Sequence, residues 1–294
     1  MIFNEVNMSV KGWLNKNTDS LVGKTVVITG STGGLGKEIC RMLASLGANL
    51  ALVDRNLKKS EQHRDLLLSI NPNISVSLVT ADMEDIESVK SACAVLEEIE
   101  FSYLILNAGA YAIPRKTCST GYDNVFQINF VSQYYIARTF APLLKKRGGK
   151  IIVVGSIAHN YSRIDQNDID FSTRKKSNLV YGNSKRYLMC AMYKLGIDTG
   201  ADVSVVHPGI TFTNITAHYP PLIFAVIKHP MKVIFMPARK ACLSVIKGVF
   251  DTCGKYEWIG PRIFDIWGSP EKTRLKTISE DEFSFISSVC DDLF

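Results

Sequence analysis

The fold is decided by the stretch Thr25-Val26-Val27-Ile28-Thr29-Gly30-Ser31-Thr32-Gly33-Gly34-Leu35-Gly36. Its first five residues have the apolar, β-branched character of a buried strand, and a helical pattern over residues 34–46 follows the glycines. Glycines allow a tight turn close to a phosphate, and a helix N-terminus offers unpaired N–H groups and a positive dipole end. The stretch therefore predicts a dinucleotide site, although a flexible glycine loop is the alternative. The cofactor-binding residues expected here are Gly30, Ser31, Thr32, Gly34, Leu35 and Gly36.

Downstream of this stretch, short apolar runs alternate with longer amphipathic ones, the pattern of βα units that build a parallel sheet. Seven strands are predicted, at residues 25–29, 49–53, 75–79, 103–106, 150–155, 202–207 and 256–259. Helices are predicted at residues 34–46, 57–70, 84–98, 122–146, 180–199 and 237–251. Right-handed crossovers then give an α/β fold, a doubly wound (Rossmann-type), mainly parallel seven-stranded sheet with helices on both faces. We expect one catalytic domain over residues 23–294.

Three segments break this pattern: a polar N-terminal extension (residues 1–22), an insert at 157–178 and an apolar segment at 210–236 rich in proline and aromatic residues. Ligands of such sheets lie beyond the carboxyl ends of the strands, so the second and third segments should flank a small-molecule substrate. The composition of 210–236 favours a lid over a lipophilic substrate. Core cover, packing against another subunit and peripheral membrane contact are the alternatives.

Composition excludes several classes of protein. The 294 residues carry a formal charge of +6 that is not gathered into a basic block, so a nucleic acid partner is not expected. The longest strongly apolar run, residues 222–227, is far shorter than the roughly 20 residues of a membrane span. The first twenty residues lack the pattern of a secretory signal, which favours a cytoplasmic protein. Seven scattered cysteines without a CxxC pair indicate reduced thiols and no metal site.

Acidic residues end or follow the second and third predicted strands. Asp54 lies eighteen residues beyond the last glycine of the loop, close to the roughly 20-residue offset of an acid that binds a ribose 2′-hydroxyl. A carboxylate there would repel a 2′-phosphate, so NAD is favoured, while the adjacent Arg55 keeps NADP as the alternative. Asp82, followed by Met83, is predicted to contact the adenine. Either aspartate has helix capping as its alternative.

Tyr181 and Lys185, in the run Tyr181-Gly182-Asn183-Ser184-Lys185, are four residues apart and so share one face of the predicted helix. A nearby positive charge stabilises a phenolate, so Lys185 is expected to lower the pKa of Tyr181 and to make it a proton-transfer group near neutral pH. A half-buried tyrosine beside a solvated lysine is the alternative.

Five motifs in order resemble the short-chain dehydrogenase/reductase family over about residues 20 to 260. They are the glycine loop at 29–36, Asn107-Ala108-Gly109, Ser156, Tyr181-x-x-x-Lys185 and Pro208-Gly209. Within the family, the stretch Gly155-Ser156-Ile157-Ala158-His159, the long gap before Tyr181 and His207-Pro208-Gly209 resemble retinol-dehydrogenase-like members.

The resemblance implies four catalytic residues. Tyr181 would be the general acid/base of hydride transfer between an alcohol or carbonyl and NAD(P), and Lys185 would also hold the nicotinamide ribose. Ser156 would donate a hydrogen bond to the substrate oxygen, with an ordinary cap or turn serine as the alternative. Asn129 would order a water relay from the lysine, with a solvent-facing helical asparagine as the alternative.

The resemblance also implies that Asn107, Ala108 and Gly109 border the adenosine, although Leu106 replaces the first asparagine of the commoner Asn-Asn-Ala-Gly motif. A plain strand-ending turn is the alternative. Pro208 and Gly209 would lie beside the nicotinamide, and Thr213 would contact its carboxamide unless it is a surface residue. His159 and His207 are expected to be structural.

These observations predict an NAD(P)-dependent short-chain alcohol dehydrogenase or carbonyl reductase. A non-catalytic dinucleotide-binding sensor or scaffold is the alternative, but such a protein would be expected to lack a member of the catalytic set. The resemblance implies a homodimer or homotetramer paired through the helices at about 122–146 and 180–199. Residues 268–294 contain no catalytic motif. This segment could pack on the lid, join a subunit interface or be partly disordered.

Overall fold

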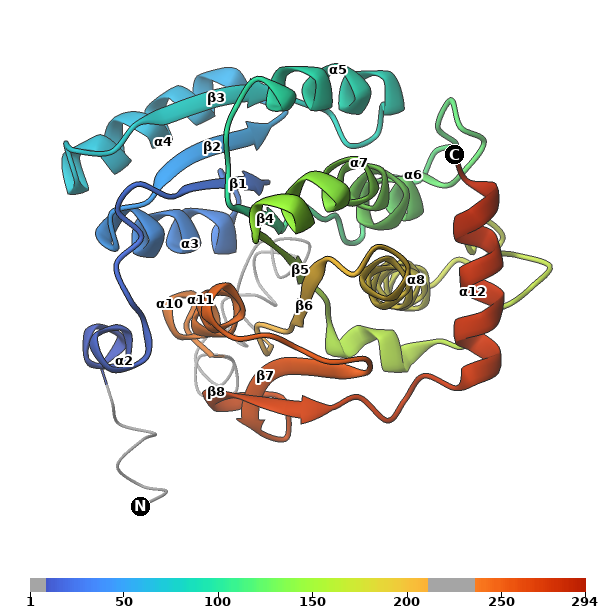
Figure 1. Cartoon of the computed structure of the whole chain (residues 1–294). Coiled ribbons are helices and arrows are strands. Elements are labelled where there is room, and N and C mark those ends of the chain that lie inside the picture. The colour runs from blue at the N-terminus through green and yellow to red at the C-terminus, as the bar shows by residue number, and fades with distance from the viewer. Residues whose placement is uncertain (1–8, 211–235) are drawn as a thin grey trace, which may run out of the picture.

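The computed structural model describes residues 9–210 and 236–294, which form an eight-stranded sheet in the order β3-β2-β1-β4-β5-β6-β7-β8 (Figure 1). Strands β1 to β7 run parallel and β8 is antiparallel to β7. The bounds are β1 (Thr25–Thr29), β2 (Asn49–Asp54), β3 (Val76–Thr80), β4 (Tyr103–Leu106), β5 (Lys150–Val154), β6 (Asp202–Val206), β7 (Glu257–Ile263) and β8 (Trp267–Arg274). The predicted doubly wound fold is confirmed, but the sheet has one strand more than predicted.

Helices cover both faces of the sheet (Figure 1). One apolar core joins the sheet to α3 (Gly34–Ser45), α4 (Leu57–Ile70) and α11 (Leu243–Phe250), and the short α10 (Ala238–Ala241) packs on α3. The other joins it to α5 (Ile86–Glu97), α7 (Ser132–Arg147), α8 (Ser177–Thr199) and α12 (Glu280–Asp292). The strands β1, β2, β4, β5 and β6 are therefore almost entirely buried, as their continuous apolar runs require, whereas the edge strand β3 is partly exposed.

The eighth strand is the main error of the strand prediction. Trp267–Arg274 contains Gly268, Pro270 and three charged residues, so it lacks the apolar alternation that identifies a strand. It lies at the edge of the sheet, its last four residues are exposed, and it pairs with only one neighbour, β7. Proline and charge are tolerated on an edge strand because one of its sides needs no partner.

The N-terminal extension is not only a polar tail. Within its described part, α2 (Val10–Asn17) is capped by Ser9, whose Oγ accepts the Gly12 N–H at 3.1 Å. Trp13 is buried in the same apolar core as α3 and α11. Trp13, with the partly buried Val10 and Leu14, thus attaches a mostly polar helix to the rest of the protein.

Three helix predictions need correction. The predicted helix at 122–146 contains α6 (Asn124–Phe126) and a π turn, η1 (Gln127–Val131), before α7 begins. The predicted helix at 237–251 is divided at Cys242 into α10 and α11. Helix α8 begins at Ser177, three residues earlier than predicted, and the insert before it includes a short 3₁₀ helix, η2 (Ile157–Tyr161).

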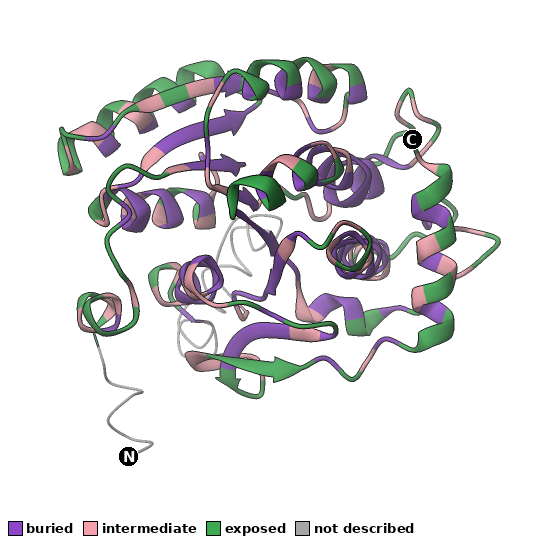
Figure 2. Ribbon diagram, in the orientation of Figure 1, coloured by how far each residue is buried: buried purple, intermediate pink, exposed green. Residues whose placement is uncertain are grey.

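Helix α8 is buried around most of its circumference (Figure 2). Its Arg186 is fully buried, and the guanidinium donates to the carbonyls of His159 (2.9 Å from Nη2), Ser162 (3.1 Å) and Thr277 (2.9 Å). It also pairs with Glu282 of α12 at 2.9 Å. One cation therefore joins α8 to η2 and to the C-terminal segment, which is ordered helix along α8 rather than a disordered tail.

The described helices include none that is long and apolar enough to cross a bilayer. All seven cysteines are free thiols, and six of them are buried.

Three buried histidines are neutral at physiological pH. His63, His159 and His207 are each no more than 2% exposed, and burial lowers the pKa of each to about 4. The rings of His159 and His207 both contact Trp258, edge-on and stacked respectively. Hydrogen bonds to Ser156 and Thr277 hold His159, and one to Asp265 holds His207, so both are structural as expected.

Removal of Glu282 should destabilise the fold because it leaves the buried Arg186 charge unpaired. Glu282→Ala is expected to lower the free energy of unfolding by about 3–5 kcal/mol. The control is Glu280→Ala on the same helix, whose pair with Lys255 is exposed (3.4 Å) and should contribute less than about 1 kcal/mol. Urea titration of both variants measures the difference, and equal losses would contradict the role given to Arg186.

Acid should destabilise the protein between pH 6.5 and pH 4. The folded-state pKa of each buried histidine lies below its unfolded value, so the unfolded chain binds more protons in this range. The stabilisation is complete above pH 6.5 and decreases by about 2 kcal/mol per histidine at pH 5. His63→Leu should therefore lose less stability than wild type between pH 7 and pH 5 in urea titrations. An identical loss in the two proteins would contradict this explanation.

Candidate active site

The glycine loop has the geometry of a phosphate cradle. Gly30 has a φ of +69°, and a Cβ there would lie 2.9 Å from the Cα of Ala108. A Cβ on Gly36 would lie 2.2 Å from the Gly30 carbonyl oxygen, so only glycine allows α3 to start this close to β1. Helix α3 begins at Gly34 without a side-chain cap, which leaves the N–H groups of its first turn for an anion. The loop therefore fits a dinucleotide pyrophosphate.

Ser31 and Thr32 bond to the acid at the end of β2. Asp54 accepts the Ser31 hydroxyl on Oδ2, and it accepts the Thr32 N–H (3.1 Å) and hydroxyl (2.9 Å) on Oδ1. The carboxylate is 6% exposed, and the neighbouring Arg55 is exposed. Helix α4 is capped by Asn56, so the alternative role of Asp54 as the helix cap is wrong. Asp54 fixes the shape of the loop and places a negative charge beside it.

Asp82 lies in a turn between β3 and α5. Its Oδ1 accepts the Glu84 N–H at 3.0 Å, while the N-cap of α5 is Asp85. Asp82 thus stabilises the turn, and its predicted contact with adenine stays a prediction. Met83 is 7% exposed and its carbonyl accepts the Ser132 hydroxyl at 2.7 Å, so its side chain belongs to the core.

Asn107 and Ala108 join the end of β4 to the glycine loop. The Asn107 side chain donates to the carbonyls of Thr29 and Gly30, both at 3.0 Å. The N–H groups of Asn107 and Ala108 donate to the Thr29 hydroxyl, also at 3.0 Å. A Cβ on Gly109 would lie 3.0 Å from Oδ1 of Asn129. The motif therefore has a structural role, and contact with adenosine stays a prediction.

Tyr181 and Ser156 come together although 25 residues separate them in the chain. Ser156 follows β5 and caps η2, its Oγ accepting the Ala158 N–H at 3.2 Å. A hydrogen bond with Ser156 lowers the pKa of Tyr181, but burial has the larger, opposite effect and raises this pKa to about 12. The expected lowering of the phenol pKa by Lys185 is therefore wrong for the structure as described. Tyr181 is protonated at neutral pH.

Lys185 lies on the same side of α8 as Tyr181, as its spacing predicted. Its ammonium is 5.9 Å from the centroid of the Tyr181 ring and donates to the Val154 carbonyl at 2.9 Å. Burial lowers the pKa of Lys185 to about 8, so it is still mostly charged at pH 7. The lysine is thus 3% exposed rather than solvated, which excludes the alternative of a surface lysine.

Asn129 is fully buried in the π turn η1 and does not face solvent. Its Oδ1 accepts the Ala110 N–H at 2.8 Å, and its Nδ2 donates to the Ala110 carbonyl (2.9 Å) and the Ser184 hydroxyl (3.0 Å). Ser184 in turn donates to the Tyr181 carbonyl at 2.8 Å. A π turn at such a site is a known feature of functional helices. The side chain positions its neighbours, and the water relay stays a prediction.

Pro208 and Gly209 follow β6. Gly209 has a φ of +79°, and a Cβ there would lie 2.9 Å from the Ile266 carbonyl oxygen. The Met236 N–H donates to the Ile210 carbonyl at 2.9 Å, so the two ends of the predicted lid meet beside Gly209. Thr213 and the rest of the predicted lid lie outside the described residues.

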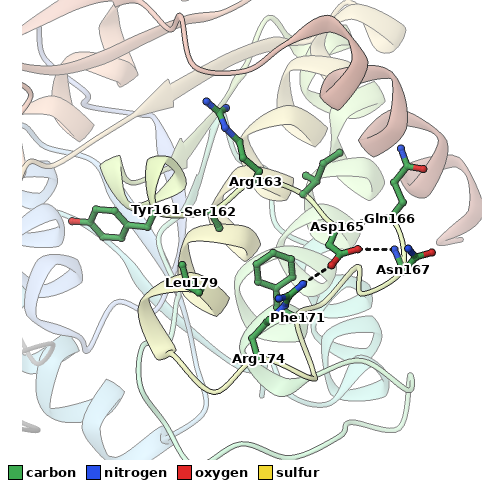
Figure 3. Close-up of a pocket in the computed structure, with 10 residues that line it drawn as sticks. Tyr161, Ser162, Arg163, Asp165, Gln166, Asn167, Phe171, Arg174 and Leu179 are labelled. Atoms are coloured by element: carbon green, nitrogen blue, oxygen red, sulfur yellow. Dashed lines mark hydrogen bonds and ion pairs between the residues drawn. The ribbon is translucent and has the colours of Figure 1, made fainter.

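A cavity of about 520 Å³ opens in the insert at 157–178 (Figure 3). Figure 3 shows Asp165 between Arg174 and Asn167, and Arg174 also lies over the Phe171 ring at 5.2 Å. The lining residues are Tyr161, Ser162, Arg163, Ile164, Asp165, Gln166, Asn167, Phe171, Arg174 and Leu179. None of the four predicted catalytic side chains lines this cavity, so it is not the site that the sequence predicted.

Sequence reasoning missed several residues around Tyr181. The Tyr111 ring lies edge-on to it, with centroids 5.3 Å apart at 88°. Gln133 accepts the Thr29 hydroxyl beneath the glycine loop at 3.1 Å. Ser184 was quoted within the helix motif without a role. Only Tyr111 had a local signal, as an aromatic residue two positions after the motif Asn107-Ala108-Gly109.

Residues 24–221 match the family model of the short chain dehydrogenases. Human retinol dehydrogenase 13 is 27% identical over 81% of this chain and 76% of its own length. Mouse retinol dehydrogenase 12 is 29% identical over 66% of this chain and 63% of its own length. The chloroplastic short-chain dehydrogenase TIC 32 A of Brassica napus is 27% identical over 66% of each chain.

Solved structures agree on the fold. An uncharacterized protein from Mycobacterium paratuberculosis has a TM-score of 0.73 at 22% identity, covering 95% of this chain and 96% of its own. A short-chain dehydrogenase from Sphingobium yanoikuyae in complex with NADPH has a TM-score of 0.60 at 22% identity, with 76% and 83% covered. The family model covers more than half of the chain and agrees with the site geometry. The chain therefore belongs to the short chain dehydrogenase family of NAD(P)-dependent oxidoreductases, in its retinol-dehydrogenase-like branch.

Proposed function

We propose that this protein is a carbonyl reductase and alcohol dehydrogenase that prefers NAD(H), acts on a lipophilic substrate and uses Tyr181 as its general acid/base. The observation that carries the proposal is the pairing of Tyr181 with Ser156 at the carboxyl end of β5, beside the buried Lys185. Two hydroxyl groups from different elements converge on one point, which is what protonation of a substrate oxygen requires.

The pKa of Tyr181 favours the reductive direction. A phenol with a pKa near 12 carries its proton at pH 7, so it is ready to donate that proton to a carbonyl oxygen. Ser156 would hold the same oxygen by a hydrogen bond, and the Lys185 charge would stabilise the phenolate that remains. When bound, the nicotinamide cofactor supplies or accepts the hydride.

The buried carboxylate of Asp54 supports a preference for NAD(H). It is fixed by Ser31 and Thr32 beside the glycine loop, where a 2′-phosphate would bring further negative charge close to it. Arg55 is the residue that opposes this preference, because it is exposed and adjacent.

A lipophilic substrate is supported by the aromatic and aliphatic residues next to the reacting groups. Tyr111, Ile113 and Ile157 are partly buried, and Ile157 directly follows Ser156. The apolar composition of the predicted lid supports the same conclusion.

The assembly and location of the protein are also proposals. A homo-oligomer formed through α7 and α8 would have to include α12, because α12 packs on α8 and Arg138 of α7 donates to the Phe294 carbonyl at 2.7 Å. Light scattering measures the assembly.

A cytoplasmic location is proposed from the sequence, and cell fractionation tests it.

Replacement of Tyr181 by Phe should abolish proton donation and leave the ring packing intact. We expect kcat for carbonyl reduction to fall at least 100-fold, consistent with the usual contribution of general acid catalysis. NADH fluorescence titration should show a dissociation constant within about threefold of wild type, because the ring still packs in place. A screen of retinoid, steroid and aliphatic carbonyls with both cofactors supplies the substrate. Wild-type turnover by the variant would exclude Tyr181 as the acid.

Asp54→Asn tests the cofactor preference without dismantling the loop. The amide oxygen can still accept from Thr32 and the amide nitrogen can donate to Ser31, so only the charge is removed. The ratio of NADPH to NADH affinity should shift toward NADPH by about tenfold, equivalent to ~1.4 kcal/mol. Arg55→Ala is the opposite control and should shift the ratio toward NADH. Fluorescence titration measures both, and tighter NADPH binding by wild type would overturn the preference.

A further inference from the structure

We propose that Tyr111 is a second tyrosine of the active site, a positioning residue whose ring holds Tyr181 in the orientation needed for proton donation. The inference rests on the proposed role of Tyr181. Its geometric basis is the edge-on contact of the two rings, with centroids 5.3 Å apart and planes at 88°. This arrangement directs the positive edge of one ring at the negative face of the other and contributes about 0.5–1.5 kcal/mol beyond burial.

The backbone before Tyr111 is held in place by Asn129. The Asn129 amide contacts both the N–H and the carbonyl of Ala110, at 2.8 and 2.9 Å. This two-point attachment fixes the peptide groups on both sides of Ala110 and so limits where the next side chain, Tyr111, can lie. The fully buried π turn that carries Asn129 adds to this rigidity.

The backbone after Tyr111 is also constrained. Ala112 has a φ of +52°, in the left-handed region that residues other than glycine rarely adopt. Such a conformation costs about 1 kcal/mol or more and persists only where surrounding contacts impose it. The chain therefore turns sharply directly after Tyr111.

Asn129 is also connected to Tyr181, through the side chain of Ser184. Its Nδ2 donates to Ser184 at 3.0 Å, and Ser184 donates to the Tyr181 carbonyl at 2.8 Å. Asn129 thus links the backbones of both tyrosines, while the ring contact links their side chains. The hydrogen bonds through Asn129 and the ring contact together hold the backbone of Tyr181 and the direction of its ring.

Tyr111 also affects the acidity of its neighbour. Its phenol raises the pKa of Tyr181, because two phenolates this close would repel each other, whereas the hydrogen bond with Ser156 lowers it. Tyr111 therefore helps to keep Tyr181 protonated, in the state that reduction of a carbonyl requires.

The test compares Tyr111→Phe, which keeps the ring, with Tyr111→Leu, which keeps bulk but not aromaticity. We expect kcat for carbonyl reduction to fall at least tenfold in the Leu variant, with the NADH dissociation constant within about twofold of wild type. The Phe variant should restore kcat to within about threefold. It should also shift the alkaline limb of the pH profile to lower pH, because the second phenol is absent.

The matched control is Tyr135→Leu. Tyr135 makes a similar edge-on contact with Phe294, at 4.9 Å and 77°, outside the site. Its loss should leave kcat, the pH profile and NADH affinity unchanged.

A readout without substrate separates this proposal from the proposed function. In protein with ¹³C-labelled tyrosine rings, the Tyr181 signal is assigned by its loss in Tyr181→Phe. Loss of the neighbouring ring should move this signal in Tyr111→Leu, and Tyr111→Phe should return it close to its original position. A signal and a kcat unchanged in Tyr111→Leu would overturn the positioning role, even if Tyr181→Phe is inactive. A fully active Tyr181→Phe would instead refute the proposed function, and a displaced signal would still establish the ring contact.

Discussion

The burial of helix α8 is the constraint on which the rest of the site depends. A helix enclosed on nearly all sides has little water to satisfy its polar groups, so most of them need partners within the protein. Lys185 meets this requirement with the Val154 carbonyl, and Ser184 meets it with Asn129 and the Tyr181 carbonyl. Arg186 points elsewhere and holds η2 together with α12. The helix thus positions Tyr181 and Lys185 on one side and the C-terminal segment on another.

The same burial reverses the electrostatic expectation for Tyr181 and Lys185. Their spacing of four suggested a cation that makes a phenol more acidic. In the structure, removal from water raises the pKa of Tyr181 to about 12 and lowers that of Lys185 to about 8. Desolvation disfavours both charged forms and is the largest cause of each shift. The result is a phenol that keeps its proton at neutral pH.

Asp54 has a structural role in the glycine loop besides the cofactor contact that the sequence predicts for it. The loop closes because Gly36 allows contact with the Gly30 carbonyl and because Asp54 collects the donors of Ser31 and Thr32. The acid that sequence reasoning assigned to the cofactor is therefore also the support of the loop. Most substitutions at Asp54 would remove both its negative charge and its hydrogen bonds to Ser31 and Thr32. The isosteric Asp54→Asn removes the charge and keeps the hydrogen bonds.

The sequence by itself determined the βα unit at residues 25–36, the seven parallel strands and the spacing that places Tyr181 and Lys185 on one face of a helix. These features are encoded by neighbours in the chain, because glycine spacing, apolar runs and helical periodicity act over a few residues. Ser156 and Asn129 became candidates only through the family resemblance. Only the tertiary structure decided the edge strand β8, the packing of α2 and α12, the contact of Tyr111 with Tyr181 and the direction of the pKa shifts. An edge strand needs little apolar pattern, and a pKa depends on which distant groups exclude water, so neither can be predicted from local sequence.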